Sequence, residues 1–201
     1  YFFVFFLHRS NEYMNVENKW IAGRLIKRYK RFFGDVKIKN KTITAHCPNT
    51  GSMYGLLNKG NKVWVTKSDN PNRKLKYTLQ IIEDKKSKVG VNTHLTNKIV
   101  HHALENNLNK EFDKKIEIKP ETKFGTNTRF DFLITQKKFK AFIEVKNVTL
   151  SRIKNLAEFP DAITSRGLKH INELLKASNM GYKIFILYLI QRNDCKLFKI
   201  A

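Results

Sequence analysis

The sequence predicts a small β-barrel followed by a mixed α/β domain. Short strand candidates separated by turn-forming residues occupy residues 20–92. A helix, three strands, a second helix and a strand follow, which is the order of an α/β layer arrangement. With 201 residues, 41% hydrophobic and 12% aromatic, the chain can fold and bury a core. We expect the boundary between the two domains near residue 93.

Residues 1–13 are expected to lie outside both domains. The apolar run 1–7 is short, has no basic region before it and is followed by polar residues, so it does not resemble a signal peptide. The chain begins with Tyr1, and Met14 is the expected start of the protein. The preceding residues are therefore interpreted as a non-native or disordered extension.

The barrel is predicted over residues 14–93. CPNTGS, NKGN and SDNPNRK supply turns between the strand candidates. The OB-fold is the commonest small barrel that binds polyanions, so we predict an OB-fold-like nucleic-acid-binding domain. The strand candidates are GRLIKRYKRFFGDVKIKN (23–40), TITAHC (42–47), KVWVTKSD (62–69) and KYTLQIIED (76–84).

The α/β domain is predicted over residues 94–201. A first helix is expected over 96–108, with Thr96 as its N-cap, and a second over 161–178. The last strand is apolar throughout, as expected of a sheet covered on both faces. The strand candidates are 116–124, 128–135, 139–150 and 182–192.

The chain is strongly basic. Lys and Arg number 39 against 17 Asp and Glu, a formal net charge of +22. An enzyme for small metabolites has no need of such a field, whereas a nucleic-acid-binding protein does. The alternative is a Lys-, Asn- and Ile-rich composition that scatters lysines everywhere. The basic excess is denser in 14–93, which suits a binding module.

Cysteine content and hydropathy indicate a cytoplasmic location. Cys47 and Cys195 are too few and too far apart for a disulfide framework or a zinc site, and Cys47 is expected in the core. No apolar run approaches a membrane span, so no membrane association is expected. The oligomeric state does not follow from the sequence.

Two charged residues interrupt the apolar strand 139–150. Glu144 and Lys146 are two positions apart, so they point to the same face of a strand. Burying either charge alone would be costly. Asp131 lies in the preceding strand, and it would lie beside Glu144 if the two strands form a hairpin.

Two adjacent carboxylates repel each other unless a cation lies between them. Asp131 and Glu144, with a backbone carbonyl such as that of Val145, would suffice for Mg²⁺ (or Mn²⁺). Lys146 would then orient or deprotonate a water, or stabilise charge developing on a phosphate. The alternative is a surface ion pair on an edge strand.

The pattern of Asp, twelve residues and then Glu-x-Lys resembles the PD-(D/E)xK nuclease superfamily, as does the order of helices and strands. The resemblance implies that Glu105 holds the metal or relays to it; otherwise Glu105 is an exposed helical residue. It also implies that Gln191 is a polar site residue. Phe130 stands where the superfamily often has proline. The residues expected to face the scissile phosphate are Arg166, Lys169 and His170.

Longer blocks resemble one family. The blocks GRLIKRYKRFF, TAHCPNTGSMYGLL, SDNPNRKLKYT, GVNTHLTN, RFDFL, FIEVKNVTL, FPDAITSRGLKHINEL and LIQRND are similar to signature blocks of the sugar fermentation stimulation protein A family, from Gly23 to Asp194. This resemblance implies an OB-fold joined to a PD-(D/E)xK nuclease-like domain, DNA binding and a bacterial or archaeal cytoplasm. It also implies a chain that continues past Ala201.

The family resemblance adds candidate nucleic-acid contacts. For the turn and the loop the alternative is structural: a well-capped turn in the first, a core tyrosine and solvated lysines in the second. Asp161 is either an N-cap of the second helix or a group that touches the metal. The candidate contacts are Asn49, Thr50 and Ser52 in one turn, Arg73, Lys74, Lys76 and Tyr77 in a loop, and Arg24, Lys27, Arg28 and Arg31 along the first strand.

Three functions remain open at this point. The first is a Mg²⁺-dependent nuclease that hydrolyses phosphodiester bonds in DNA or RNA, and the intact Asp131, Glu144 and Lys146 favour it. The second is a non-catalytic DNA-binding regulator of sugar metabolism genes, which the family name favours. The third is an RNA-associated protein whose acidic residues are structural; it predicts salt-dependent binding without metal dependence.

Overall fold

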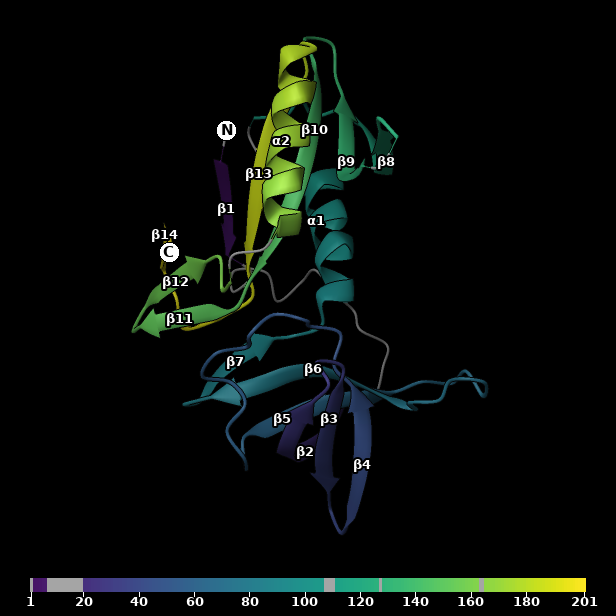
Figure 1. Ribbon diagram of the computed structural model, residues 1–201, viewed down its shortest axis with the longest axis vertical. Coiled ribbons are helices and arrows are strands. Elements are labelled where there is room, and N and C mark those ends of the chain that lie inside the picture. Colours follow the sequence, from purple (N-terminus) through teal and green to yellow (C-terminus); the bar gives the residue numbers. More distant parts are fainter. Residues whose placement is uncertain (1, 7–19, 107–110, 127, 163–164) are drawn as a thin grey trace. The chain divides into compact units, whose positions relative to one another are not determined.

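The computed structural model describes residues 2–6, 20–106, 111–126, 128–162 and 165–201 (Figure 1). Within them the chain divides into two compact units. Of the described residues, the barrel unit contains Phe6, 20–94, 147–162 and 190–201, and the α/β unit contains those of 2–5, 95–146 and 165–189. The chain passes between the units near the predicted boundary at residue 93. It also returns twice to the barrel unit, which a linear division of the sequence does not anticipate.

Five strands of the barrel unit close on themselves. The sheet order is β4-β3-β2-β5-β6-β7, and β4 also pairs with β6 in parallel, which closes the barrel (Figure 1). The predicted OB-fold-like barrel is confirmed, with β7 as an additional strand. The strands are β2 (Trp20–Tyr29), β3 (Phe33–Ile38), β4 (Lys41–His46), β5 (Lys62–Lys67), β6 (Tyr77–Asp84) and β7 (Ser87–Gly90).

The barrel core follows from strand alternation, because every second side chain points inward. Leu25, Val36 and Val63 are fully buried, and Cys47 joins them, as expected for a core cysteine. Gly23 permits close approach of β2 and β3: a Cβ at this position would lie 2.5 Å from Val36 Cγ1 and 2.9 Å from the Lys37 carbonyl oxygen.

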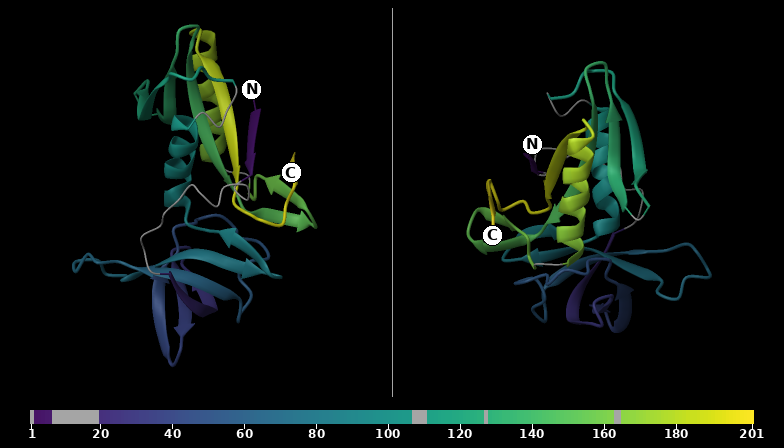
Figure 2. Two further views of the ribbon diagram at one scale, coloured as in Figure 1. Left: turned by 180° about the vertical axis from the view of Figure 1, so that it is seen from behind. Right: turned by 45° about the horizontal axis from the view of Figure 1, so that its top comes forward.

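The α/β unit is built on a five-stranded sheet of order β1-β13-β10-β9-β8. Figures 1 and 2 show α2 running along β10 and β13. Leu174 and Ala177 of α2 pack there against Phe142. The predicted mixed α/β domain is confirmed. Its elements are α1 (Thr96–Glu105), β8 (Glu117–Phe124), β9 (Thr128–Thr135), β10 (Lys140–Val148), α2 (Ser165–Asn179) and β13 (Lys183–Ile190).

Two local expectations were wrong. Residues 2–6 form β1 (Phe2–Phe6), an edge strand beside β13, because consecutive apolar and aromatic residues suit a strand that gains backbone partners. Residues 7–19 lie outside the described residues. Thr96 is the first helical residue of α1 rather than its N-cap: the cap is Leu95, which ends the short 3₁₀ helix Thr93–Leu95.

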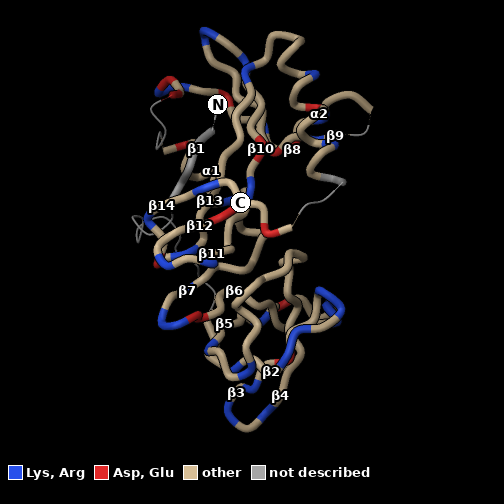
Figure 3. Tube along the Cα trace, turned by 60° about the vertical axis from the view of Figure 1, so that its left-hand side comes forward, with Lys and Arg blue, Asp and Glu red and all other residues tan. Residues whose placement is uncertain are grey.

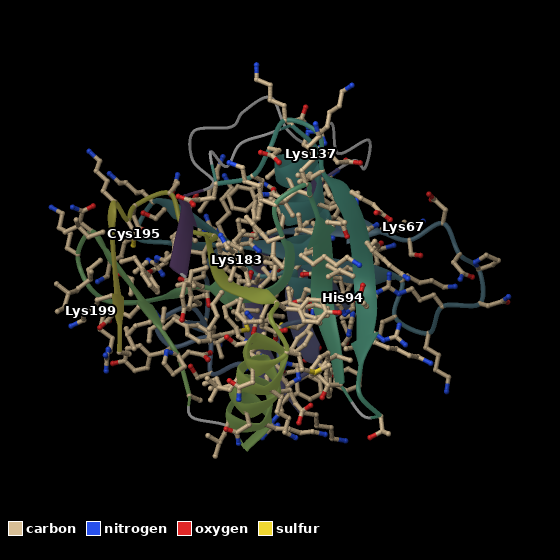
Figure 4. The ribbon with its side chains drawn as sticks, turned by 90° about the horizontal axis from the view of Figure 1, so that it is seen from above. Lys67, His94, Lys137, Lys183, Cys195 and Lys199 are labelled. Atoms are coloured by element: carbon tan, nitrogen blue, oxygen red, sulfur yellow. The ribbon has the colours of Figure 1, made fainter. Side chains whose placement is uncertain are left out.

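A three-stranded sheet in the barrel unit was not predicted. It consists of β11 (Leu150–Ile153), β12 (Leu156–Phe159) and β14 (Leu197–Ile200), with β12 and β14 parallel. Lys199, labelled in Figure 4, lies on β14, 3.5 Å from the carboxylate of the buried Glu158. Strands of four residues are too short for alternation to reveal them.

Neither described helix could cross a membrane. Within the described ranges, neither α1 nor α2 has the length and apolar character of a membrane span.

Candidate functional site

The antiparallel hairpin β9–β10 brings the two predicted acidic positions together. Its ladder runs from Lys140 opposite Thr135 to Ile143 opposite Phe132. The next step in this register sets Glu144 opposite Asp131. Next to this position the Asp131 side chain accepts a backbone hydrogen bond from β10: the Val145 N–H donates to Asp131 Oδ2 at 2.7 Å. The expected pairing of strands 128–135 and 139–150 is therefore present.

Glu144 is a buried carboxylate with unequal oxygens. Its side chain is 6% exposed. Oε1 accepts a hydrogen bond from Lys146 Nζ at 2.8 Å and lies 2.7 Å from His170 Nδ1. Oε2 is buried and has no hydrogen-bond partner among the described residues. A buried, unpaired carboxylate oxygen is costly and calls for an ion or a water.

Asp131 is held by neutral donors. Its Oδ1 accepts a hydrogen bond from Asn97 Nδ2 at 2.8 Å. Burial raises the pKa of Asp131, the charge of Glu144 raises it further, and the Val145 N–H opposes that rise. Each Asp131 oxygen retains a lone pair. Lys146 offsets one of the two negative charges, and a divalent cation between the carboxylates would offset the other.

Helix α2 positions His170, because its apolar residues on the same side pack against β10. His170, Leu174 and Ala177 are spaced so that they lie on one side of the helix. Leu174 and Ala177 pack against Phe142, and His170 reaches Glu144, two residues further along β10. His170 was expected to face a phosphate, but in the structure it contacts the carboxylate.

Glu105 is not joined to the cluster. It ends α1, and its carboxylate lies 3.3 Å from His101 Nδ1. Asn97, in the first turn of α1, makes the contact to Asp131 instead. Eight residues separate the two positions, about 12 Å along a helix, so one helix cannot present both at one point. Asn97 was missed because an uncharged residue beside a helix start carries no sequence signal of this kind.

A hollow of about 670 Å³ in the α/β unit lies between the β8–β9 turn and α2, and none of Asp131, Glu144, Lys146 and His170 lines it. Lys169, next to His170 on α2, lines it, as does Phe142, two residues from Glu144. Lys123 adds a second positive charge, while Phe124 and Tyr182 supply aromatic surface. The side chain of Arg166, the remaining predicted contact on α2, lies outside the described residues.

Asp161 binds the turn 49–52 rather than a helix start. Its Oδ2 accepts hydrogen bonds from the Ser52 N–H at 2.9 Å and from Ser52 Oγ at 3.4 Å. Asn49 is buried, and its side chain accepts the Gly51 N–H at 2.9 Å. The structural interpretation therefore accounts for Asn49 and Asp161. Thr50 and Ser52 remain exposed.

Gln191 follows β13 and is buried in the barrel unit. Its Nε2 donates to Asn147 Oδ1 at 2.5 Å, and its backbone N–H donates to the Val148 carbonyl at 3.0 Å. Its own carbonyl accepts the Gly90 N–H at 2.9 Å. Gln191 thus ties β7 to the end of β10, a structural role.

The basic residues predicted along the first strand differ in their surroundings. Arg28 donates to the carbonyls of Arg31 and Asn49, at 3.1 and 2.7 Å, and so braces two turns. Arg31 lies in an exposed turn. Lys27 is paired at 3.9 Å with Asp35, whereas Arg24 is exposed. Figure 3 shows basic residues gathered at the barrel turns, including the β3–β4 turn.

The loop before β6 is partly structural. Arg73 donates to Thr78 Oγ1 at 2.7 Å, and Lys76 donates to the Pro71 carbonyl at 2.5 Å. Tyr77 packs against the barrel core, which is the alternative to a stacking role. Lys74 is exposed.

A closed OB barrel and a mixed α/β domain with a buried carboxylate cluster define a two-domain class of protein. The model described as "SfsA N-terminal OB domain" matches residues 26–91, and that described as "Sugar fermentation stimulation protein RE domain" matches residues 94–201. The chain belongs to the sugar fermentation stimulation protein (SfsA) family.

Relatives agree with this assignment. The sugar fermentation stimulation protein homolog of Pelagibacter ubique (strain HTCC1062) is 59% identical over 181 residues, 90% of this chain and 78% of the relative. The homolog of Ruegeria sp. (strain TM1040) is 45% identical over 184 residues, 90% of this chain and 79% of that relative. A solved structure, Pyrococcus furiosus SfsA in complex with Ca²⁺, superimposes with a TM-score of 0.84 at 28% identity, covering 94% of this chain and 80% of that one.

Proposed function

We propose that this protein is a Mg²⁺- or Mn²⁺-dependent nuclease that hydrolyses phosphodiester bonds in DNA or RNA. One observation carries the proposal: the buried Oε2 of Glu144 has no hydrogen-bond partner among the described residues and belongs to a carboxylate adjacent to Asp131. The pattern of Asp131, Glu144 and Lys146 is that of a PD-(D/E)xK nuclease.

The donor set fits a hard cation. Glu144 Oε2, an oxygen of Asp131 and the Val145 carbonyl would hold it, and all are oxygen ligands. Among the described residues no group of three or more acidic, histidine or cysteine side chains could hold a metal, so the proposed ion would have two carboxylates and take its remaining ligands from water, as Mg²⁺ does. The Ca²⁺ complex of the Pyrococcus furiosus relative concerns an ion of the same oxygen-seeking class. When bound, such an ion stabilises negative charge on a phosphate and makes a water more acidic.

The chain's own side chains have distinct tasks in this proposal. Lys146, with 22% of its side chain exposed, can stabilise charge that develops on a phosphate or orient the attacking water. His170 holds Glu144 through Oε1, so that Oε2 stays directed to the ion. Asn97 and the Val145 N–H fix the orientation of Asp131. Lys169, exposed and next to His170 on α2, would contact the substrate backbone.

Nucleic acid is the proposed partner because of charge. A net charge of +22 suits a polyanion, and double-stranded DNA is the first substrate to test, followed by RNA. The exposed Arg24, Arg31 and Lys74 are the predicted contacts least occupied by internal bonds. A cytoplasmic location is part of the same proposal.

A non-catalytic DNA-binding regulator is the second candidate. The observation that favours it is the family description, which records stimulation of sugar fermentation rather than cleavage. In that case the carboxylate cluster would bind a cation for structural reasons only.

The test uses labelled single- and double-stranded DNA and RNA with Mg²⁺, with Mn²⁺ and with EDTA. Glu144→Gln and Lys146→Gln are compared with Lys138→Gln, an exposed turn residue. We expect metal-dependent cleavage by wild type and by Lys138→Gln, and loss of cleavage with binding retained in the two site variants. Binding without cleavage by every version, wild type included, supports the regulator instead.

A further inference from the structure

Three basic side chains form one row across the outward surface of the barrel. Arg24 of β2 lies opposite Lys37 of β3 on one side and Lys62 of β5 on the other. Side chains directly opposite each other on one face of a sheet are about 5 Å apart at their Cβ atoms. The row points outward, because the next residues along these strands, Leu25, Val36 and Val63, are buried in the core.

The row is not neutralised internally. Like charges directly opposite each other destabilise a sheet unless an anion lies between them. Among the described residues, none of the three has a carboxylate within ion-pair distance, and Arg24 donates only to the Gly60 carbonyl, at 3.1 Å. The same strands therefore present charge that a phosphate backbone would compensate.

Trp64 extends this surface by one step along β5. Its neighbours across the sheet are Ala22 and Ile81. Lys62 Nζ lies 5.0 Å and Lys88 Nζ 5.4 Å from the centre of the indole ring. Trp64 is partly exposed, and its β2 neighbour Ala22 has a small, exposed side chain. An aromatic ring set among cations is the arrangement that stacks a nucleobase while the cations bind its phosphates.

Two acidic residues share this outward surface: Asp35, two residues from Lys37 on β3 and paired with Lys27 at 3.9 Å, and Glu83 of β6. Glu83 pairs in register with Lys88 on β7 and follows Ile82, which lies opposite Val63. Even so, neither Lys62 nor Lys88 lies within ion-pair distance of an acidic side chain in the described residues. Both ammonium groups lie over the indole instead. The five residues Arg24, Lys37, Lys62, Lys88 and Lys27 outnumber Asp35 and Glu83, so the surface keeps a positive excess.

We propose that this surface, the Trp64 face (Arg24, Lys37, Lys62, Trp64 and Lys88), binds single-stranded nucleic acid, with one base stacked on Trp64 and the backbone along the basic row. The inference rests on the proposed function, in which nucleic acid is the substrate. It adds that the strand bound by the barrel is single. In a duplex the bases are stacked on one another, so a duplex offers Trp64 no free base. Lysine side chains are long enough to turn from the ring to a phosphate while their stems stay on it.

The first experiment uses Trp64 as its own reporter. The chain has two tryptophans, Trp20 and Trp64, so Trp20→Phe leaves Trp64 as the sole indole. An unlabelled oligothymidylate and a duplex of equal length are titrated in EDTA, with binding followed separately by anisotropy of a labelled strand. We expect Trp64 fluorescence to be quenched by the single strand and to change little with the duplex. Anisotropy-detected binding of the single strand with no quenching overturns the proposal.

The second experiment measures affinity. Trp64→Leu should weaken single-strand binding about tenfold or more, while Trp64→Phe keeps most of it, because stacking on an aromatic ring survives. The double variant Lys62→Gln with Lys88→Gln should reduce the slope of log affinity against log salt concentration by about 0.7 per lysine. Glu83→Gln should tighten binding.

The matched control is the double variant Lys137→Gln with Lys138→Gln. Both residues are exposed in the β9–β10 turn, and Lys137 is labelled in Figure 4. This control double variant removes the same amount of charge as the Lys62 and Lys88 double variant, but it should leave the salt dependence of binding unchanged. An equal loss of slope in both double variants overturns the proposal, because the binding would then follow net charge alone.

The outcomes separate this inference from the proposed nuclease. A wild-type protein that binds no nucleic acid overturns both. Metal-dependent cleavage by wild type, with unchanged single-strand affinity in folded Trp64→Leu and in the Lys62 and Lys88 variants, overturns the Trp64 face alone. Should Trp64→Leu not fold, Trp64→Phe and the lysine variants decide the question.

Discussion

Glu144 Oε1 lies 2.7 Å from His170 Nδ1, and this contact leaves Oε2 of the same carboxylate without a hydrogen-bond partner in the described part of the chain. Lys146 shares Oε1, at 2.8 Å. Two potential cations therefore contact one oxygen, while the other oxygen is buried and has no hydrogen-bond partner among the described residues. This asymmetry suits a carboxylate that is held from one side and binds an ion from the other.

Glu144→Gln should abolish stabilisation by divalent cations. A ligand present at a hundredfold excess over its dissociation constant stabilises the folded state by about 2.7 kcal/mol. We therefore expect Mg²⁺ or Ca²⁺ to raise the melting temperature of wild type and to leave Glu144→Gln unchanged. Differential scanning calorimetry with and without EDTA measures the difference.

Glu105→Gln is the matched control for that variant. Glu105 is an acidic residue of the same unit, but it pairs with His101 and makes no contact with the cluster. It should retain the full cation-dependent increase in melting temperature. Loss of this increase in Glu105→Gln would show that the metal site lies elsewhere than at Glu144.

Asn97→Ala should weaken both stability and cation binding. The variant removes the hydrogen bond to Asp131 Oδ1, and such a bond to a charged group contributes about 1.5–3 kcal/mol. Chemical unfolding and calorimetric titration with Mg²⁺ test the two effects. Asn106→Ala, at the other end of α1, removes a bond to the His102 carbonyl and should leave the Mg²⁺ affinity intact.

Gly23→Ala should destabilise the barrel by about 1–3 kcal/mol, because the new methyl group collides with Val36 and with the Lys37 carbonyl. Gly34→Ala on the neighbouring strand is the comparison. A Cβ at position 34 would lie 3.9 Å from Leu79 Cδ2 and 4.0 Å from the Ala45 carbonyl oxygen, which are ordinary contact distances. Urea unfolding should distinguish the two variants, and equal stabilities would contradict the close approach of β2 and β3.

The stability contributed by Glu158 should depend on pH in the acid range. Hydrogen bonds from Arg152 lower the pKa of Glu158 from 4.5 to about 2. A lowered carboxyl pKa stabilises the folded state above the unfolded-state value, and this contribution is lost as pH falls from about 4.5 to about 2. Wild type should therefore exceed Glu158→Gln in stability at pH 7, with the difference shrinking towards pH 2. A difference independent of pH would exclude an ionic origin.

Much of the architecture follows from patterns local in sequence. Inward alternation in segments such as 62–69 and turn chemistry in CPNTGS predict a barrel, and the apolar run 182–192 predicts a covered strand. The pairing of Asp131 with Glu144 was also accessible, because a hairpin of short connection sets its own register. Short strands such as β11, β12 and β14 escaped, since four residues contain too few alternations and their partners are distant in sequence.

The sequence by itself determined the two fold classes, the basic character and the Asp131, Glu144 and Lys146 pattern, because each rests on composition or on spacing within one strand or hairpin. Only the tertiary structure decided that Asn97 rather than Glu105 meets Asp131, that His170 holds Glu144, and that Asp161 and Gln191 tie backbone segments together. It also set Lys37, Arg24 and Lys62 in one row beside Trp64. These contacts join residues from different elements, and their geometry depends on helix packing and sheet register, which no local spacing encodes.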